Sequence, residues 1–252
     1  MLAEERRQQI LETLNDSGSV RVNELSKNLS VTKETIRKDL ELLNQRNLLK
    51  RTHGGALAIK NNKEELAFNL RKQKNVNEKQ QIAKKARELV EPGDTLFLDA
   101  SSTCLYFARE ILDIENITIV TNSVRNTVEL AENKNISIIT TGGLLRPHNY
   151  SLIGPQANEF IKRYNADKFF ASCTGISAEI GATDSNDLEI EVKRNMSQKS
   201  KETFLLVDHT KFNHVELSTF VQLKDIKKII TDNPEHPDIQ KAFNDFSDDF
   251  VI

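Results

Sequence analysis

The sequence predicts an α/β protein in two parts, a small helical domain followed by a larger domain with a mostly parallel sheet. Two patterns support this prediction. Near the N-terminus, apolar residues recur at helical spacing in two short segments, and a glycine pair follows them. From Lys79 onward, helical stretches alternate with short β-rich runs, which is typical of a parallel sheet covered by helices.

The elements of the first part follow from apolar spacing and from turn residues. Leu25 and Leu29 share one face of a short helix, and Ile36, Leu40 and Leu43 share one face of the next, so the two helices can share a small core. The expected elements are a helix over about residues 4–15 that ends at Gly18, a strand over 19–21, a helix over 22–29, a helix capped by Thr32 and a strand over 48–52.

A hairpin completes this part, and Gly54 and Gly55 are expected to supply the positive φ of its tip. Three helices and a hairpin make a winged helix-turn-helix, whose recognition helix enters the DNA major groove by its N-terminal end. Side chains on the start and outer face of that helix, and on the wing, are expected to reach phosphates or base edges. The residues expected to face DNA are Thr32, Lys33, Thr35, Arg37, Lys38, Arg51 and His53.

Charge is unevenly distributed along the chain. Residues 1–80 carry 16 Lys and Arg against 11 Asp and Glu, whereas residues 81–252 carry 19 against 26. Within residues 27–51 the balance is 7 against 3, which suits contact of one end of the chain with a polyanion. A solvated helix face explains this charge about equally well, but the turn residues and the glycine pair favour DNA.

Composition excludes several classes of protein. No apolar run approaches the roughly 20 residues of a membrane-spanning helix, and the first ten residues lack the apolar core of a signal peptide. Cys104 and Cys173 are too few for a disulfide scaffold or a zinc site, and His53 and His148 have no partner at metal-ligand spacing. We therefore expect a cytoplasmic protein without a metal or cofactor and without a membrane partner.

The chain is expected to divide into a DNA-binding domain over residues 1–57, a charged linker over 58–80 and an α/β domain over 81–252. Six β-rich runs of the α/β domain are expected to form strands, over residues 95–98, 117–121, 136–140, 168–174, 203–207 and 228–231. Polar and small residues follow most of these runs. One such turn is an ordinary loop by itself, but several that meet at one edge predict a ligand site, because ligands bind at the carboxyl ends of parallel strands.

The quoted segments resemble the DeoR family of bacterial sugar-metabolism regulators over nearly the whole chain. In the first domain the resemblance is carried by RRQQIL, VNELSKNLSVTKETIRKDLELL and RTHGGA. In the second it is carried by DTLFLDASST, IVTNS, TTGG and VDHTKF, with Glu189 and Lys193 in DLEIEVK. The resemblance implies a C-terminal domain similar in fold to ribose-5-phosphate isomerase, which binds a phosphorylated sugar and thereby changes the affinity for operator DNA.

Physical reasoning gives the residues of that implied pocket their roles. Hydroxyls and helix amides near Ser101 are suited to a phosphate, although a simple helix N-cap is an equal alternative. Carboxylates are expected to accept hydrogen bonds from sugar hydroxyls, and Lys211 to bind a carbonyl or phosphate oxygen. The expected effector-binding residues are Asp99, Ser101, Ser102, Thr103, Gly142, Gly143, Arg146, Asp184, Glu189 and Lys211.

Plain alternatives stand beside two of these assignments. Gly142 and Gly143 bring the backbone close to a ligand, or form a structural turn beside a surface Arg146. Glu189 and Lys193 are four residues apart on an expected helix, so a surface ion pair is the alternative to a binding role.

The expected function is that of a DNA-binding transcriptional regulator, a repressor of a sugar or carbohydrate catabolic operon that a phosphorylated sugar intermediate relieves. A homo-oligomer, dimer or tetramer, is expected because one recognition helix covers too few base pairs to select an operator. Two alternatives are a sugar-phosphate isomerase-like enzyme with an accessory DNA-binding domain, and a winged-helix protein–protein module with an inert α/β domain. An isomerase has no need of the first 57 residues, so we expect a regulator and not an enzyme.

Overall fold

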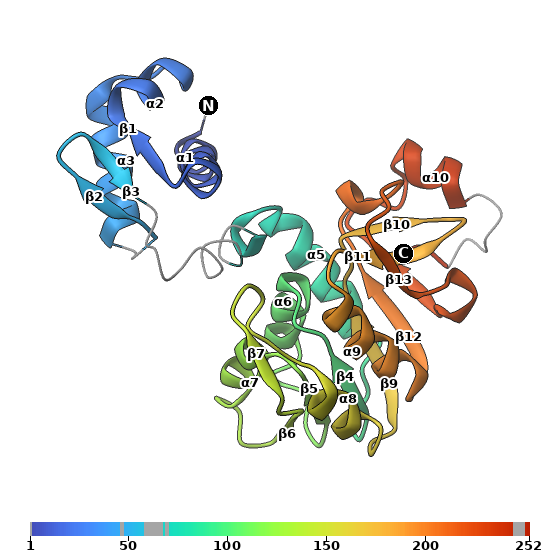
Figure 1. Cartoon of the computed structure of the whole chain (residues 1–252). Coiled ribbons are helices and arrows are strands. Elements are labelled where there is room, and N and C mark those ends of the chain that lie inside the picture. The colour runs from blue at the N-terminus through green and yellow to red at the C-terminus, as the bar shows by residue number, and fades with distance from the viewer. Residues whose placement is uncertain (1, 46–47, 58–67, 69–70, 244–249) are drawn as a thin grey trace. The chain divides into compact units, whose positions relative to one another are not determined.

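The computed structural model describes residues 2–45, 48–57, 68, 71–243 and 250–252. The chain divides into two compact units, residues 1–74 and residues 75–252 (Figure 1). Most of the linker expected over residues 58–80 lies outside the described residues, and its last residues belong to a helix of unit 2, α5 (Val76–Arg87). Among the described residues, no helix is both long and apolar enough to cross a membrane.

Unit 1 is a winged helix-turn-helix, as the sequence predicts. Its elements are α1 (Ala3–Ser17), β1 (Ser19–Arg21), α2 (Val22–Asn28), α3 (Lys33–Gln45), β2 (Lys50–Thr52) and β3 (Gly55–Leu57). The strands form an antiparallel sheet in the order β1-β3-β2. Leu25, Ile36, Leu40 and Leu43 are buried in one core with the inward face of α1, which confirms the shared core that the apolar spacing predicts.

The glycines of unit 1 have different roles. Gly18 ends α1 with φ of 73°, the left-handed conformation that glycine adopts without a steric penalty. The prediction of a positive φ at Gly54 and Gly55 is wrong, because neither residue is among the glycines that have a positive φ. Gly55 is needed for close packing instead, since a Cβ atom there would lie 1.9 Å from the carbonyl oxygen of Val20 on the neighbouring strand.

A buried carboxylate joins two helices of unit 1. Asp39 of α3 is 5% exposed and accepts hydrogen bonds from Nε of Arg6 at 2.6 Å and from Nε of Arg7 at 3.1 Å, both on α1. The pair of arginines compensates the buried charge, which would otherwise be costly. This contact fixes the inner side of α3 and leaves its outer side exposed.

Unit 2 is built on a six-stranded parallel sheet in the order β14-β12-β9-β4-β5-β6. The strands are β4 (Thr95–Leu98), β5 (Thr118–Thr121), β6 (Ser137–Thr140), β9 (Ala166–Ala171), β12 (Ser200–Leu206) and β14 (Lys228–Ile230). All six expected strands are therefore confirmed, with boundaries that differ by up to three residues. The chain order reverses between β4 and β9, so the topological switch point of the sheet lies between these two strands.

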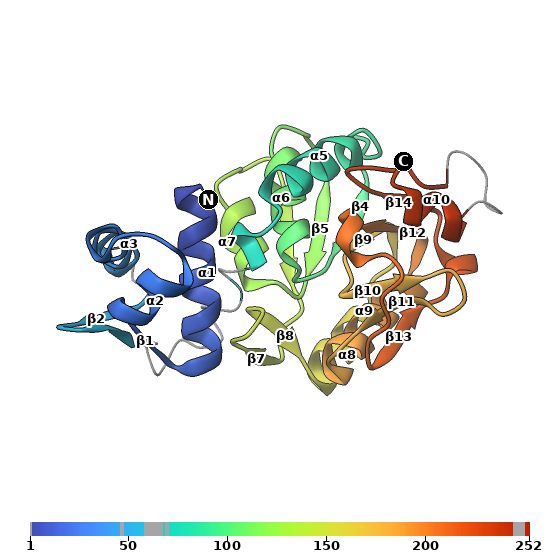
Figure 2. The ribbon, with the colours of Figure 1, turned by 90° about the horizontal axis from the view of Figure 1, so that it is seen from above.

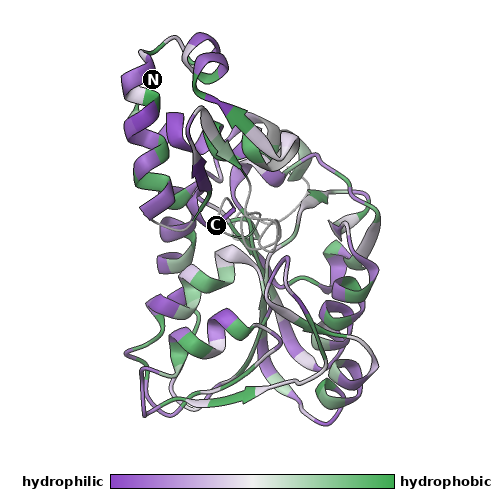
Figure 3. Cartoon of the chain, turned by 60° about the vertical axis from the view of Figure 1, so that its left-hand side comes forward, coloured by the Kyte–Doolittle hydropathy of each residue, from purple (hydrophilic) through white to green (hydrophobic). Residues whose placement is uncertain are grey.

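Helices cover both faces of this sheet. One face packs against α5, α6 (Ser102–Glu110) and α7 (Val124–Leu130), and the other against α8 (Pro155–Ile161), α9 (Asp187–Gln198) and α10 (Pro237–Phe243). Figure 2 shows α5 beside α6, and the helices in Figure 3 are banded with hydrophobic and hydrophilic residues, as expected for helices with one buried face. Phe170 stacks on Phe204 and is tilted against Phe107, with ring centroids 5.1 and 4.4 Å away.

Two small sheets complete unit 2, and the β-rich runs did not predict them. One is the hairpin of β7 (Leu144–Arg146) and β8 (Ser151–Ile153). The other joins β10 (Gly175–Ser177), β11 (Gly181–Asp184) and β13 (Ser218–Val221). Two short 3-10 helices, η1 (His209–Lys211) and η2 (Leu223–Asp225), follow β12 and β13. The first of them carries Lys211 at the carboxyl edge of the large sheet.

Candidate functional site

The start of α3 presents two hydroxyl groups and an exposed basic face. Oγ1 of Thr32 accepts a hydrogen bond from the backbone amide of Thr35 at 3.2 Å, so Thr32 caps the helix as the sequence predicts. The two threonine hydroxyls lie 2.9 Å apart. Lys33, Arg37 and Lys38 are exposed on the outer side of the helix. The layout matches a recognition helix whose first turns face DNA.

Salt bridges on this face are of the weak, exposed kind. Arg37 lies 3.3 Å from Glu34, and both side chains are more than half exposed. On the wing, the guanidinium of Arg51 pairs with Glu41, while the backbone amide of Arg51 donates to Oδ1 of Asn44 at 3.1 Å. His53 is exposed at the hairpin tip. Because exposed pairs contribute little to stability, both arginines can exchange a carboxylate for a phosphate at small cost.

In unit 2, the carboxyl ends of β4 and β9 meet at the switch point of the sheet. Asp99 follows β4 and is fully buried. Its Oδ1 accepts from the amide of Ser101 at 2.9 Å, and its Oδ2 accepts from the amide of Ser172, which follows β9, at 3.0 Å. The side-chain amide of Asn126 donates to the Asp99 carbonyl at 2.9 Å. Asp99 therefore joins the two strands on either side of the switch point.

A buried lysine from α9 links this carboxylate to a second one. Nζ of Lys193 lies 2.9 Å from Asp99, 2.6 Å from Asp184 and 2.7 Å from the carbonyl oxygen of Ser172. Asp184 also accepts from the amide of Thr174 at 3.0 Å. Both oxygens of each carboxylate thus accept hydrogen bonds inside the protein.

Burial and ion pairing shift the pKa values of Asp99 and Lys193 in opposite directions. Burial raises the pKa of Asp99, but the charge of Lys193 and the hydrogen bonds near Ser101 outweigh it and hold that pKa below its ordinary value. Burial lowers the pKa of Lys193, and the two carboxylates more than reverse this, so the pKa of Lys193 is raised. Asp99 and Lys193 are therefore both charged near neutral pH, and the ammonium group of Lys193 lies within 2.9 Å of Asp99 and 2.6 Å of Asp184.

The loop after Asp99 begins a helix. Oγ of Ser101 accepts from the amide of Cys104 at 3.1 Å, so the side chain of Ser101 serves as the N-cap of α6. Ser102 and Thr103 are 6% and 4% exposed in the first turn of α6. The N-cap alternative is thus the role that Ser101 has in this structure. Amides of the first turn still give this helix end a partial positive charge.

A second polar cluster surrounds Glu189 at the start of α9. Its carboxylate accepts from the hydroxyl of Ser151 at 2.5 Å, from the side-chain amide of Asn149 at 2.6 Å and from the guanidinium of Arg146 at 3.1 Å. Glu189 is 8% exposed. The alternative of a surface ion pair between Glu189 and Lys193 is wrong, because both side chains are buried and each pairs with other residues.

Glycines shape the loop after β6. Gly142 has φ of 65° and Gly143 has φ of 110°, both in the left-handed region that favours glycine. A Cβ atom on Gly143 would lie 2.7 Å from the carbonyl oxygen of Ile153, so this position also needs a close backbone approach. Arg146, which follows on β7, is partly buried and paired with Glu189. The backbone conformation and packing of this turn therefore require both glycines, independently of any ligand.

Lys211 lies at the end of η1, just after β12. Its side chain is half-buried, and its backbone amide donates to the carbonyl of Asp208 at 3.0 Å. Burial raises the pKa of the Cys173 thiol, and the charges of Lys193 and Lys211 act on it in the opposite direction. Lys211 therefore lies in the electrostatic neighbourhood of the Lys193 cluster.

The structure thus brings the expected residues together in three groups. Asp99 and Asp184 meet at Lys193, and the amide of Ser101 is bonded to Asp99. Arg146 meets Glu189, and the charge of Lys211 acts on the Cys173 thiol. Residues outside the expected effector-binding set are Ser172, Thr174, Asn149 and Ser151. Ser172 and Thr174 lie at the end of the expected run 168–174 and directly after β9, so the rule of polar strand ends points to them. Asn149 and Ser151 have no such signal, because the β7–β8 hairpin brings them to Glu189.

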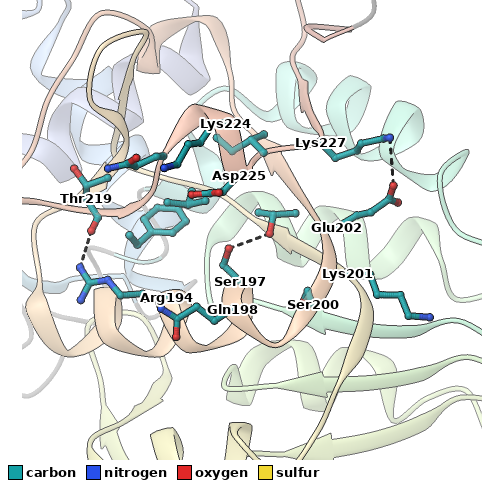
Figure 4. A pocket seen from close by; sticks show the side chains of 15 residues that line it. Arg194, Ser197, Gln198, Ser200, Lys201, Glu202, Thr219, Lys224, Asp225 and Lys227 are labelled. Atoms are coloured by element: carbon teal, nitrogen blue, oxygen red, sulfur yellow. Dashed lines mark hydrogen bonds and ion pairs between the residues drawn. The ribbon is translucent and has the colours of Figure 1, made fainter.

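A cleft of about 880 Å³ lies at the other end of the strands. It is lined by the end of α9, by the first residues of β12, by β13 and by η2 with the residues that follow it (Figure 4). Figure 4 shows Arg194 directed at the Thr219 carbonyl, at 2.7 Å, and Lys227 at Glu202, at 3.4 Å. Lys201 pairs with Asp167 at 2.7 Å. These three basic side chains already pair with other groups of the protein. We therefore take the carboxyl edge of the large sheet as the candidate site.

A winged helix-turn-helix with a basic outer face, joined to an α/β domain with a polar carboxyl edge, defines a DNA-binding transcriptional regulator with a sensor domain. The family model described as the DeoR-like helix-turn-helix domain matches residues 6–62, and that of the DeoR C terminal sensor domain matches residues 74–233. The protein belongs to the DeoR family of transcriptional regulators.

Named relatives agree with this assignment. The chain is 41% identical to the uncharacterized HTH-type transcriptional regulator YulB of Bacillus subtilis, over 97% of this chain and 95% of the relative. It is 36% identical to the HTH-type transcriptional regulator GolR of Listeria innocua, over 96% and 95%. It is 37% identical to the L-fucose operon activator of Haemophilus influenzae, over 88% of each chain. These matches favour a regulator over an isomerase-like enzyme.

Solved structures give a weaker likeness. Ribose 5-phosphate isomerase A from Methanocaldococcus jannaschii is 17% identical with a TM-score of 0.40, over 53% of each chain. The eIF2B delta subunit from Chaetomium thermophilum is 15% identical with a TM-score of 0.46, over 69% of this chain and 63% of that one. The family assignment depends on the sequence matches and not on these values.

Proposed function

We propose that this regulator is a repressor of a sugar catabolic operon in the cytoplasm, and that a phosphorylated sugar intermediate bound in unit 2 relieves repression. The observation that carries the proposal is the Lys193 cluster at the switch point between β4 and β9. Ligands of open α/β sheets bind in the crevice at such a point. Polar groups from several loops therefore meet at the proposed position of the ligand.

The phosphate is proposed to bind at the start of α6. The amides of its first turn, with Ser102 and Thr103, offer hydrogen-bond donors and a positive helix end. Lys211 supplies a positive charge from the opposite side of the switch point, after β12. A phosphate dianion gains from both, because charge-assisted hydrogen bonds are about twice as strong as neutral ones.

The sugar hydroxyls are proposed to reach the Glu189 cluster. Arg146, Asn149 and Ser151 orient the Glu189 carboxylate, which can accept further hydrogen bonds from a polyol. Asp99 and Asp184 then act by holding Lys193 in place and not by contacting the sugar, because each carboxylate forms an ion pair with the buried ammonium group of Lys193. This changes the roles that the sequence suggested for these two aspartates.

A sugar-linked role is supported by the name of the Haemophilus influenzae relative, which refers to a fucose operon. That relative is named an activator, so the direction of the response is a separate part of our proposal. Repression relieved by the ligand requires that the liganded protein binds operator DNA more weakly than the unliganded protein.

The DNA-binding form is proposed to be a homo-oligomer built from dimers, with the α3 helices and wings of two copies on one operator. A single recognition helix reads only a few base pairs, and two-fold pairing doubles the contacts. Sedimentation of the purified protein at micromolar concentration tests this proposal. A monomer that binds operator one-to-one would contradict it.

A gel-shift assay on the operator region tests the function as a whole. We expect a shifted complex without ligand, and loss of that complex when a hexose, pentose or triose phosphate is added. A parallel assay for conversion of each sugar phosphate should show no product. Turnover of a sugar phosphate without any DNA complex would overturn the proposal in favour of an enzyme.

A further inference from the structure

The first residue of unit 2 makes a hydrogen bond to the carboxyl edge of the large sheet. Nδ2 of Asn75 donates to Oδ1 of Asp208 at 3.1 Å, across 133 positions of the chain. Asn75 directly follows Lys74, the last residue of unit 1. Asp208 is 2% exposed and follows β12. The contact therefore connects the point where the chain enters unit 2 with a loop of the proposed effector site.

The conformation of Asn75 shows that helix capping does not explain its side chain. Asn75 is the N-cap residue of α5, with φ of 52° and ψ of 48°, in the left-handed region. An asparagine at this position ordinarily accepts a hydrogen bond from an amide of the first helical turn. The Asn75 side chain makes no such bond and is directed at Asp208 instead.

Asp208 belongs to the same short turn as Lys211. Its Oδ1 also accepts from the amide of Thr210 at 3.1 Å and from the Thr210 hydroxyl, and its carbonyl accepts from the amide of Lys211. These bonds close η1 into one compact turn. A displacement of the Lys211 backbone toward a bound phosphate would therefore move the Asp208 carboxylate or break these bonds.

The helix that begins at Asn75 packs against α6 and contacts a further loop. Ile82, Ala83 and Ala86 of α5 are fully buried in the core that α6 also lines. Nζ of Lys85 donates to the carbonyl of Thr231, just after β14, at 2.9 Å. The helix α6 and the turns after β12 and β14 therefore all contact α5 or its N-cap residue.

We propose that the hydrogen bond between Asn75 and Asp208 transmits effector binding to the segment that leads to the DNA-binding unit. Asn75 is then a positioning residue for the response, and not a contact for the effector. The inference rests on the proposed function. A ligand changes DNA affinity only through contacts that differ between two conformations, and this hydrogen bond is such a contact if η1 moves on binding.

Two variants of the full chain isolate this bond. Asn75→Gly removes the side chain and keeps the left-handed backbone, which alanine would strain. Asn75→Asp keeps the shape but places a carboxylate against Asp208. Arg87→Ala is the control, because it removes a 2.9 Å hydrogen bond to the Glu110 carbonyl from the other end of α5.

Two measurements separate the binding of a sugar phosphate from its effect on operator affinity. Calorimetry gives the affinity for the sugar phosphate that binds the parent best in a panel of triose, pentose and hexose phosphates. Fluorescence anisotropy gives operator affinity with and without that compound. We expect both the sugar-phosphate affinity and the unliganded operator affinity to stay within about twofold of the parent in Asn75→Gly. The factor by which the compound changes operator affinity should fall by about threefold to tenfold, as expected for loss of one hydrogen bond.

The other variants sharpen the outcome. Asn75→Asp should lose at least as much of the response, and Arg87→Ala should respond like the parent. A parental response in both Asn75 variants, an equal loss in Arg87→Ala, or a loss that follows weaker sugar-phosphate binding would overturn the inference alone. Failure of every panel compound to bind the parent would remove the proposed function and the inference together.

Discussion

Nζ of Lys193 lies 2.6 Å from Oδ2 of Asp184, and both side chains are buried at the carboxyl edge of the large sheet. The two residues come from different elements, α9 and the end of β11. Lys193 also pairs with Asp99, so the three side chains hold α9, the end of β11 and the end of β4 together beside the proposed effector site. Removal of the cation would leave two buried carboxylates without compensation.

We therefore expect Lys193→Met to destabilise unit 2 by about 3–5 kcal/mol, the usual cost of leaving a buried charge unpaired. Urea unfolding of the full-length variant measures this change. Lys201→Met is the matched control, because Lys201 also pairs with an aspartate, at 2.7 Å from Asp167, but its side chain is 78% exposed. Equal stability of the two variants would contradict the role assigned to Lys193.

The same cluster predicts a pH dependence. The pKa of Asp99 in the folded protein lies below its ordinary value of 3.8. A carboxylate of this kind contributes stability above its unfolded pKa and loses that contribution as pH falls through its folded pKa. The pKa of Lys193 is raised above 10.5, so its contribution is complete below that pH and is lost as pH rises through the folded pKa.

The difference in unfolding free energy between the parent and Asp99→Asn should therefore be constant between about pH 5 and pH 10 and shrink progressively at more acidic pH. Urea titrations across this range measure it. A difference that changes strongly between pH 5 and pH 8 would show that another group controls the cluster.

The wing offers a prediction with a closely matched control. Gly55→Ala places a Cβ atom 1.9 Å from the Val20 carbonyl oxygen, whereas Gly54→Ala meets no atom within 4 Å. We expect Gly55→Ala to destabilise unit 1 by about 1–3 kcal/mol, the usual cost of overpacking, and to disrupt the pairing of β1 and β3. Operator binding should weaken by about tenfold as the wing loses its position, or about 1.4 kcal/mol. Gly54→Ala should bind like the parent in an anisotropy titration. Parental binding by Gly55→Ala would show that the wing does not need this packing.

Arg37 tests the DNA-facing side of α3. Arg37→Ala should cost about 1–3 kcal/mol of operator binding if the side chain reads a base edge. Its exposed pair with Glu34 is weak, so the fold should be unaffected. Arg163→Ala removes the same charge from an exposed position in unit 2 and should leave operator affinity unchanged. An operator affinity equal to the parent's would remove Arg37 from the contact surface.

The sequence predicted the parts of the fold in which local pattern and tertiary structure agree. Apolar runs such as 95–98 and 117–121 are long enough to mark buried strands, and the polar residues after them mark the carboxyl edge. The spacing of Ile36, Leu40 and Leu43 fixed the inner face of α3, and Thr32 occupies the N-cap that its side chain favours.

Contacts between distant segments were beyond reach of such patterns. The spacing of Glu189 and Lys193 suggests a surface pair, because nothing local tells that α9 is covered by the β7–β8 hairpin and the sheet. Asn149 reaches Glu189 through that hairpin, and Asn75 reaches Asp208 across 133 residues. The sequence suggests that Gly55 is a turn residue. Glycine is needed there because β1 approaches its backbone closely, and only the tertiary structure shows this approach.

The central claim is that a sugar phosphate bound at the carboxyl edge of unit 2 changes operator affinity. The most direct test measures calorimetric binding and operator anisotropy together, for the parent, for Lys211→Met and for Lys224→Met, an exposed lysine of η2 that lines the cleft at the amino end of the strands. We predict that at least one sugar phosphate weakens operator binding by the parent by about 5-fold to 150-fold. Lys224→Met should match the parent, and Lys211→Met should bind operator normally but lose both the sugar phosphate and the response. If no sugar phosphate binds the parent at millimolar concentration, or if Lys211→Met responds like the parent, the claim is contradicted.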